Sequence, residues 1–328
     1  MISKDTLFSA AEALGGFRAL RYLTRKREKV LMYHRIIDHP QIPAITPKEF
    51  EQQIRYLKRH FNIKPVDQLI QARVQGTSDD NAIAITFDDG HADFYQNAWP
   101  ILKKYQVPAS LYVTTGFIDN QCWLWPDLLR HILWTTANPG LLFNGNQHLS
   151  LQNPHRQSTW NTIASHCLSL ASDERIAFIN NLAHTLNVPT DSPPSTLYKA
   201  VTWDNLREMH AAGLEIGSHT VSHRILSTLN SHELTMELRA SKQRIEEQME
   251  SKINGICYPN GMRKDINQQV EQQAASEGYR YGLVAYPAKT NRNNLFHQGR
   301  WAAPKSFTLF KRMVSGISRD GNPQGEHV

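Results

Sequence analysis

Residues 82–90 read AIAITFDDG, six apolar or β-branched residues followed by two aspartates and a glycine. An apolar run of this length that ends in turn residues is typical of a strand buried in a parallel sheet. Five other runs have the same character, namely 29–33 (KVLMY), 109–114 (ASLYVT), 214–217 (LEIG), 255–258 (GICY) and 281–285 (YGLVA). We therefore predict a sheet of several parallel strands.

Segments with helical periodicity lie between these strands. Residues 47–59 begin with proline and place Phe50, Ile54 and Leu57 on one face. Similar patterns occur at 94–105, 231–249 and 269–277. Strands that alternate with helices predict an α/β fold, as a parallel sheet or a barrel.

Four of the predicted strands are followed directly by residues that could serve a functional site. These are His34, Asp88, Asp89, His219, Pro259 and Asn260. In α/β barrels, the loops at the carboxyl ends of the strands meet on one face. We therefore expect these residues to lie together.

The adjacent carboxylates of Asp88 and Asp89 point in different directions at a strand end, so one can bind a metal ion while the other faces a reacting water. His219 and His223, in SHTVSH, are four residues apart and can ligate one ion. Each pattern alone arises easily by chance, but both occur at strand ends. One aspartate and two histidines suit zinc or a similar first-row ion.

The motifs ITFDDG, SHTVSH and CYPNG occur in this order, and together the chain resembles the polysaccharide deacetylase family, the family-four carbohydrate esterases. The flanking segments LMYHRI and PILKKYQVPASLYVTTGFID also fit. The resemblance covers roughly residues 30–300. It implies a distorted (β/α) barrel of about seven strands. It also implies a metal-dependent hydrolase that removes N-acetyl groups from a glycan or a lipid-linked sugar.

The resemblance assigns roles to individual residues. Asp89, His219 and His223 would hold a divalent ion, zinc first and cobalt or nickel as alternatives. Asp88 would be the general base that takes a proton from a metal-bound water. The third motif, with Tyr258, Pro259 and Asn260, would contact substrate, and the Asn260 backbone N–H would stabilise the oxyanion.

This third motif departs from the family pattern, which begins with arginine and ends with an aromatic residue. Here Cys257 stands at the arginine position and Asn260 at the aromatic one. Arg300, in HQGRWAAP, could supply the missing guanidinium to Asp88. A surface position for Arg300 is an equally good interpretation.

The general acid has two candidates. His297 matches a late Leu-x-His motif of the family, although it follows the polar run TNRNN rather than a clear strand. His34 follows the first strand and is expected at the same face. Histidine suits the role because its unperturbed pKa is near 6.5, and the two alternatives stay open.

Residues 120–200 interrupt the barrel pattern and predict a helical insertion at the catalytic face within a barrel of residues 30–315. Trp123, Trp125 and Asp127 open this insertion. A tryptophan could stack on a sugar ring, and Asp127 could bind a hydroxyl. Alternatively, the tryptophans anchor the insertion to the barrel. We expect His91, directly after Asp-Asp-Gly, to be a solvated residue at a helix start.

The chain has 328 residues, a net charge of +6 and a pI of about 9.2. This excess permits an anionic partner, but the basic residues are not interleaved with aromatic residues as in a nucleic-acid-binding face. We expect no nucleic-acid partner.

The N-terminal segment, residues 1–29, combines a predicted helix at 7–23 with six basic residues clustered at its C-terminal end, from Arg18 to Lys29. It shows no secretory signal pattern, so a cytoplasmic protein is the expectation. Peripheral docking to the inner membrane surface and solvated capping of the helix are both compatible with the basic cluster. The last residues, 316–328, are polar and predict a frayed tail.

Other interpretations use the same residues. An O-acetyl esterase or a deformylase could employ the same metal site. A glycan-binding protein with weakened catalysis would fit the altered third motif, although it would not need Asp88.

Overall fold

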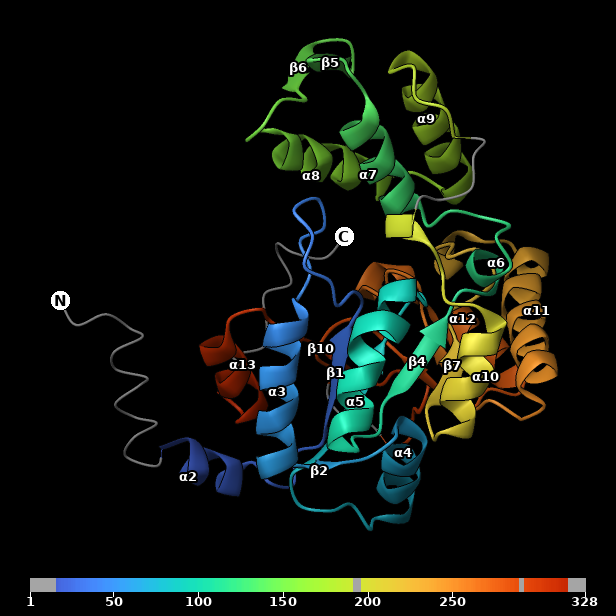
Figure 1. The fold of residues 1–328 in the computed structure, drawn as a ribbon. Helices are drawn as coiled ribbons and strands as arrows, with labels where there is room; N and C mark the ends of the chain where they lie inside the picture. The colour runs from blue at the N-terminus through green and yellow to red at the C-terminus, as the bar shows by residue number, and fades with distance from the viewer. Residues whose placement is uncertain (1–15, 191–195, 289–291, 318–328) are drawn as a thin grey trace.

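A computed structural model describes residues 16–190, 196–288 and 292–317. Its centre is a parallel sheet in the order β10-β1-β3-β4-β7-β8-β9 (Figure 1). The strands are β1 (Lys29–Tyr33), β3 (Ala82–Phe87), β4 (Ser110–Val113), β7 (Glu215–Ser218), β8 (Gly255–Cys257), β9 (Tyr281–Leu283) and β10 (Trp301–Ala302), while the short β2 (Asn62–Ile63) pairs with β3. All six predicted strands are present, and the observed bounds of most differ from the predicted bounds by a few residues at the ends.

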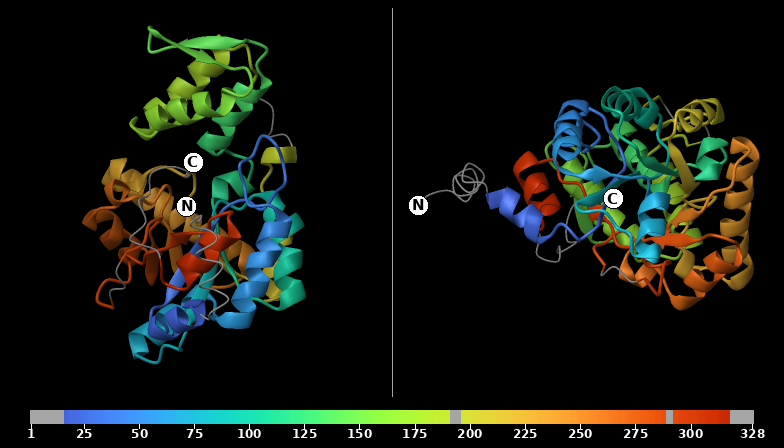
Figure 2. Two further views of the ribbon diagram at one scale, coloured as in Figure 1. Left: turned by 90° about the vertical axis from the view of Figure 1, so that its left-hand side faces the viewer. Right: turned by 90° about the horizontal axis from the view of Figure 1, so that it is seen from below.

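The two ends of the sheet approach each other. Leu283 at the end of β9 forms a parallel bridge with Gln298, just before β10. β10 in turn pairs with β1 through Leu31 and Trp301. The sheet therefore curls into a distorted barrel of seven parallel strands with the helices outside (Figure 2), as predicted.

The barrel is surrounded by α3 (Pro47–His60), α5 (Trp99–Tyr105), α10 (Trp203–Ala211), α11 (Ser231–Met249), α12 (Gln268–Ser276) and α13 (Phe307–Val314), while α4 (Val66–Gln75) lies at its end away from the insertion (Figure 1). The start of α3 shows how local sequence sets a boundary. Thr46 and Glu49 form a reciprocal capping box, and Pro47 opens the first turn. The predicted helix at 94–105 divides into a π-helical turn (Phe94–Ala98) and α5.

The insertion stands over one end of the barrel (Figures 1 and 2). It follows β4 and the short α6 (Thr115–Ile118), so it lies at the carboxyl ends of the strands. Its elements are α7 (Trp125–Thr135), β5 (Gly140–Phe143), β6 (Gln147–Ser150), α8 (Arg156–Cys167) and α9 (Ser172–Thr185). They enclose a hydrophobic cluster of their own.

The β5–β6 hairpin is absent from the purely helical prediction for the insertion. Its turn contains Asn144 and Gly145, both in the left-handed region with φ of 50° and 74°. Asn-Gly between apolar segments is a strong hairpin signal, because both residues tolerate positive φ. The sequence therefore carried a sign of this hairpin.

The N-terminal helix α2 (Gly16–Leu23) lies at the end of the barrel away from the insertion (Figure 1). Phe17 is buried, whereas Tyr22 and Leu23 are exposed. The rest of the helix predicted at 7–23 lies outside the described residues, as do residues 318–328 of the predicted tail. None of the helices in the described ranges is long and apolar enough to cross a membrane.

Candidate active site

Asp88 and Asp89 follow β3 at the carboxyl end of the barrel. The Asp88 N–H continues the strand pairing by donating to the Tyr33 carbonyl at 3.1 Å. The chain then turns, because Asp89 has a φ of 76° and Gly90 a φ of 93°. Both aspartates are buried, at 2% and 8% exposure. The turn sends the two carboxylates in different directions, as the sequence predicted.

Arg300 holds the Asp88 carboxylate. Its Nη1 and Nη2 each donate to one carboxylate oxygen at 2.7 Å. Its Nε donates to the Val284 carbonyl at 3.1 Å, and the whole side chain is inaccessible to solvent. The alternative interpretation of Arg300 as a surface residue is therefore wrong.

This ion pair governs the charge of Asp88. Burial alone would raise the pKa of Asp88, but the charge and hydrogen bonds of Arg300 outweigh burial and hold the pKa well below its usual range. Asp88 is consequently a carboxylate at neutral pH, with its orientation set by a bidentate contact.

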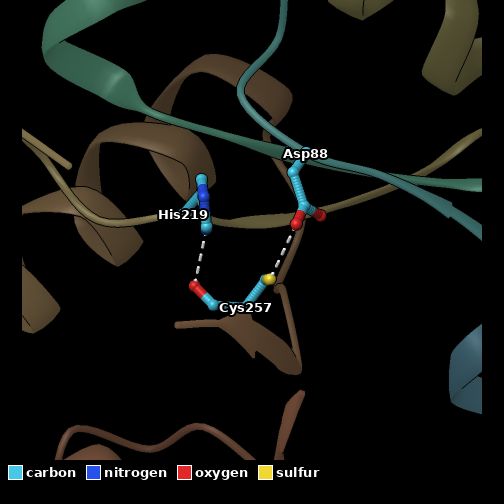
Figure 3. Close-up of side chains that lie close together, drawn as sticks. All are labelled: Asp88, His219 and Cys257. Atoms are coloured by element: carbon cyan, nitrogen blue, oxygen red, sulfur yellow. Dashed lines mark hydrogen bonds between the residues drawn. The ribbon is translucent and has the colours of Figure 1, made fainter. Parts of the chain in front are cut away.

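Cys257 connects this ion pair to His219 (Figure 3). Its Sγ lies 2.8 Å from Arg300 Nη2 and 3.3 Å from Asp88 Oδ2. Its backbone carbonyl accepts a hydrogen bond of 2.8 Å from His219 Nδ1. That bond assigns the proton to Nδ1 and leaves the lone pair on Nε2.

The Nε2 atoms of His219 and His223 both face Asp89. Each lies 3.5 Å from Asp89 Oδ1. This oxygen is buried and has no hydrogen-bond partner within the described residues. Burial lowers the pKa of His223 to about 4, so its ring is neutral, as a metal ligand must be. A buried carboxylate oxygen beside two imidazole Nε2 atoms fits a divalent ion of the zinc type.

A second cluster, Asp88, His219 and Cys257, also has ligand-type atoms within 4.8 Å of one another. It fits an ion less well. Arg300 Nη2 already donates to both the carboxylate and the sulfur, and His219 Nδ1 already donates to the Cys257 carbonyl. The chemistry therefore favours the set of Asp89, His219 and His223.

His34 and His297 differ in their distance from this centre. His34, which follows β1, is about half exposed, and its Nε2 lies 3.8 Å from Asp88 Oδ2. His297 Nδ1 bonds Glu271 at 2.7 Å, and its Nε2 bonds the Tyr286 hydroxyl at 2.6 Å. Both nitrogens of His297 are thus engaged away from Asp88, so the structure favours His34 as the general-acid candidate.

Comparisons with known proteins match this geometry to a family. The polysaccharide deacetylase model matches residues 75–141 and 148–282, more than half of the chain. The chain belongs to the polysaccharide deacetylase family. This confirms the resemblance inferred from the three motifs.

Individual polysaccharide deacetylase relatives are distant. YxkH of Bacillus subtilis (strain 168) is 21% identical over 275 residues, which are 83% of this chain and 68% of YxkH. The poly-β-1,6-N-acetyl-D-glucosamine N-deacetylase of Staphylococcus aureus is 32% identical over 79 residues, about a quarter of each chain. The Streptococcus pyogenes deacetylase PplD, solved with acetate, superposes with a TM-score of 0.59 at 19% identity, covering 88% of this chain and 97% of PplD. This last likeness supports the barrel fold.

The third deacetylase motif departs from the sequence-based expectation. Tyr258 is 1% exposed, and its hydroxyl donates to the Phe296 carbonyl at 3.0 Å, so its side chain cannot contact substrate. Pro259 is also buried. Asn260, with a φ of 59°, donates its side-chain amide to Asp265. The Asn260 backbone N–H makes no hydrogen bond within the described residues, so it stays a candidate oxyanion donor.

The residues that open the insertion also require corrections. Asp127, expected to bind a substrate hydroxyl, is buried and accepts a 2.6 Å hydrogen bond from His91 Nε2. His91 is 3% exposed rather than solvated, and its Nδ1 lies 3.7 Å from Asp89 Oδ2. The insertion thus touches the Asp-Asp-Gly turn through a buried pair that no local pattern predicted.

The two tryptophans have different environments. Trp125 is buried in the core of the insertion, with the Arg175 guanidinium 5.1 Å from its ring centre. Trp123 is half-buried and lies against the rings of His131 and Tyr198. Trp125 therefore belongs to the insertion's own core rather than anchoring it to the barrel, and Trp123 stays the candidate for contact with a sugar ring.

Proposed function

We propose that this polysaccharide deacetylase family member is a divalent-metal-dependent enzyme that removes N-acetyl groups from a glycan of N-acetylhexosamine units. One observation carries the proposal. The unpartnered Asp89 oxygen and the Nε2 atoms of His219 and His223 lie together beside an Asp88 carboxylate oriented by Arg300. The staphylococcal relatives, named for poly-β-1,6-N-acetyl-D-glucosamine, support this substrate class.

A bound zinc, cobalt or nickel ion would supply Lewis acidity to the acetamide carbonyl and to an attacking water. The chain's own residues supply the proton transfers. Asp88 Oδ2 takes a proton from the water, because it is ionised and lies on the side of the carboxylate nearest His34. Arg300 keeps that oxygen in place throughout.

His34 then protonates the leaving amine from Nε2. It is the partly exposed histidine next to Asp88, so it can reach both the base and an entering substrate. The Asn260 backbone N–H donates to the developing oxyanion. Trp123 offers a flat apolar surface to a sugar ring.

Acetate release tests this function directly. The metal-free protein is reloaded with zinc, cobalt or nickel and incubated with oligomers of β-1,6-N-acetylglucosamine. O-acetylated and N-formylated glycans serve as parallel substrates. We expect metal-dependent acetate release from the N-acetyl oligomers. Preferential turnover of the O-acetyl or N-formyl substrates would assign the esterase or deformylase alternative instead, and binding of oligomers without turnover would indicate a glycan-binding protein.

We also propose a peripheral contact between the N-terminal segment and an anionic membrane surface, where a lipid-linked sugar would be met. Arg18, Tyr22 and Leu23 on α2 are exposed and suit such a contact. Lys29, counted in the basic cluster, is buried in β1 and cannot take part. Arg25 and Lys26 pair with Asp80, which reduces their free charge.

A further inference from the structure

The backbone between the two histidine ligands is strained. Thr220 has a φ of 69° and His223 a φ of 57°. The left-handed region disfavours residues with a Cβ, and a β-branched residue such as Thr220 most of all. Such conformations persist only where surrounding contacts determine them. The histidine loop, residues 219–223, therefore needs external support to keep both imidazoles on Asp89.

Part of that support comes from α6. The Thr115 N–H donates to the Thr220 carbonyl at 3.0 Å, and the Gly116 N–H donates to the Val221 carbonyl at 2.8 Å. A Cβ at Gly116 would approach the Val221 oxygen to 2.6 Å, so glycine permits this close contact. These bonds satisfy the carbonyl groups of Thr220 and Val221 and leave the N–H groups of Val221 and Ser222 to another partner.

That partner is Glu237 on α11. One carboxylate oxygen, Oε2, accepts from the backbone N–H of Val221 at 2.9 Å and of Ser222 at 3.0 Å. The other, Oε1, accepts from the Ser222 hydroxyl. Glu237 is 8% exposed and pairs with no lysine or arginine in the described ranges of the chain. Both of its oxygens are therefore directed at the loop, where hydrogen bonds to a carboxylate are stronger than bonds between neutral groups.

We propose that Glu237 is the positioning residue that holds the histidine loop in its metal-binding conformation. It contacts neither Asp89 nor an imidazole and acts through the peptide groups of Val221 and Ser222. This role deepens the proposed function, since it presumes that His219 and His223 bind the metal. It predicts a site that is formed before the ion arrives, because α6 and α11 hold the loop from both sides.

Glu237→Gln tests the proposal. Glutamine keeps the shape of the side chain but loses the charge and replaces one acceptor with a donor that faces N–H and O–H groups. Glu247→Gln, on an exposed position of the same helix, is the matched control. Ser222→Ala removes one bond to Glu237 and keeps the two backbone bonds, so it provides a milder variant that folds if Glu237→Gln does not.

Two measurements are made on each protein. Hydrogen exchange of residues 219–223 in the metal-free protein should accelerate by about tenfold or more in Glu237→Gln, less in Ser222→Ala, and not at all in Glu247→Gln. Zinc affinity, measured by competition with a chelator, should fall by roughly 10–100-fold in Glu237→Gln, the range typical when a supporting contact of a metal ligand is lost.

The two readouts separate failure of the inference from failure of the proposed function. Unchanged exchange in Glu237→Gln and Ser222→Ala overturns the role of Glu237, whether or not the protein is a deacetylase. Faster exchange with unchanged zinc affinity also overturns it, since Glu237 would then stabilise the loop without positioning ligands. Weaker zinc binding in the variant, with a wild type that releases no acetate, supports the role of Glu237 and refutes only the deacetylase activity.

Discussion

Arg300 and Asp88, 212 positions apart in the sequence, meet in a bidentate ion pair with both N–O distances at 2.7 Å. The pair exists because β10 joins the barrel beside β1, and from just before β10 the Arg300 side chain reaches Asp88 at the end of β3. The Arg300 guanidinium therefore lies beside Cys257, the residue that stands at the arginine position of the third motif.

Loss of this pair should change the pH dependence of the reaction. In Arg300→Ala the buried Asp88 loses the charge that depresses its pKa, while burial continues to raise it. The acidic limb of the pH–rate profile should therefore move to higher pH, and turnover at neutral pH should fall by roughly 10²-fold or more. Arg280→Ala, at an exposed position, is the control, and an unmoved acidic limb would contradict the role of Arg300.

His219→Ala should lose tightly bound metal while remaining folded. The variant removes one of three ligand atoms, whereas Asp88→Asn leaves all three in place. We expect Asp88→Asn to retain one equivalent of zinc and to lose about 10²–10⁴-fold in rate, the usual contribution of a general base. Elemental analysis measures the metal content of both variants, and circular dichroism checks that they are folded. A full zinc equivalent in His219→Ala would refute the ligand assignment.

His34→Ala and His297→Ala should differ in their effect on leaving-group chemistry. Without an acid at the site, an N-acetyl substrate should react roughly 10²-fold more slowly, because its amine leaves only when protonated. An activated aryl acetate needs no proton and should react nearly as fast as with the wild type. His297→Ala should affect neither substrate, since its ring nitrogens bond Glu271 and Tyr286. The opposite pattern would make His297 the acid.

Glu215, at the other end of β7, should make the protein less stable as pH rises. Burial and the neighbouring Asp67 raise the pKa of Glu215 to about 7. The native state then holds a proton that the unfolded chain releases above its ordinary pKa of about 4.3. The contribution of Glu215 to the free energy of unfolding is fully present below about pH 4.3. It falls as pH rises from there through 7, by an amount on the order of 3 kcal/mol. Urea unfolding at pH 5 and pH 8 should show this loss in the wild type and a smaller one in Glu215→Gln.

Membrane contact should depend on the exposed apolar residues of α2. The double variant Tyr22→Ser and Leu23→Ser should sediment less with anionic vesicles than the wild type, and high salt should weaken binding of both. Leu142→Ser, at another exposed apolar position on the insertion hairpin, is the control. Equal binding of the double variant and the wild type, or no binding of either, would refute the proposed contact.

The sequence by itself determined the barrel and the metal-binding candidates. Strands such as 82–87 are recognisable because apolar runs and helical periods are local patterns. Asp88, Asp89, His219 and His223 sit directly after such strands, and parallel strands direct their carboxyl ends to one face. Local sequence patterns were therefore sufficient to predict that these four residues lie together.

Only the tertiary structure decided the contacts that orient those residues. Arg300 reaches Asp88, Asp127 binds His91, and Glu237 holds the histidine loop, each across a separation that leaves no periodic signal. It also decided that the Tyr258 side chain packs in the core cluster that includes Val270 and Ala274 of α12, while the neighbouring Cys257 faces Asp88. A side chain's partner depends on which distant segments meet, and this follows from the packing of the whole chain rather than from its neighbours in sequence.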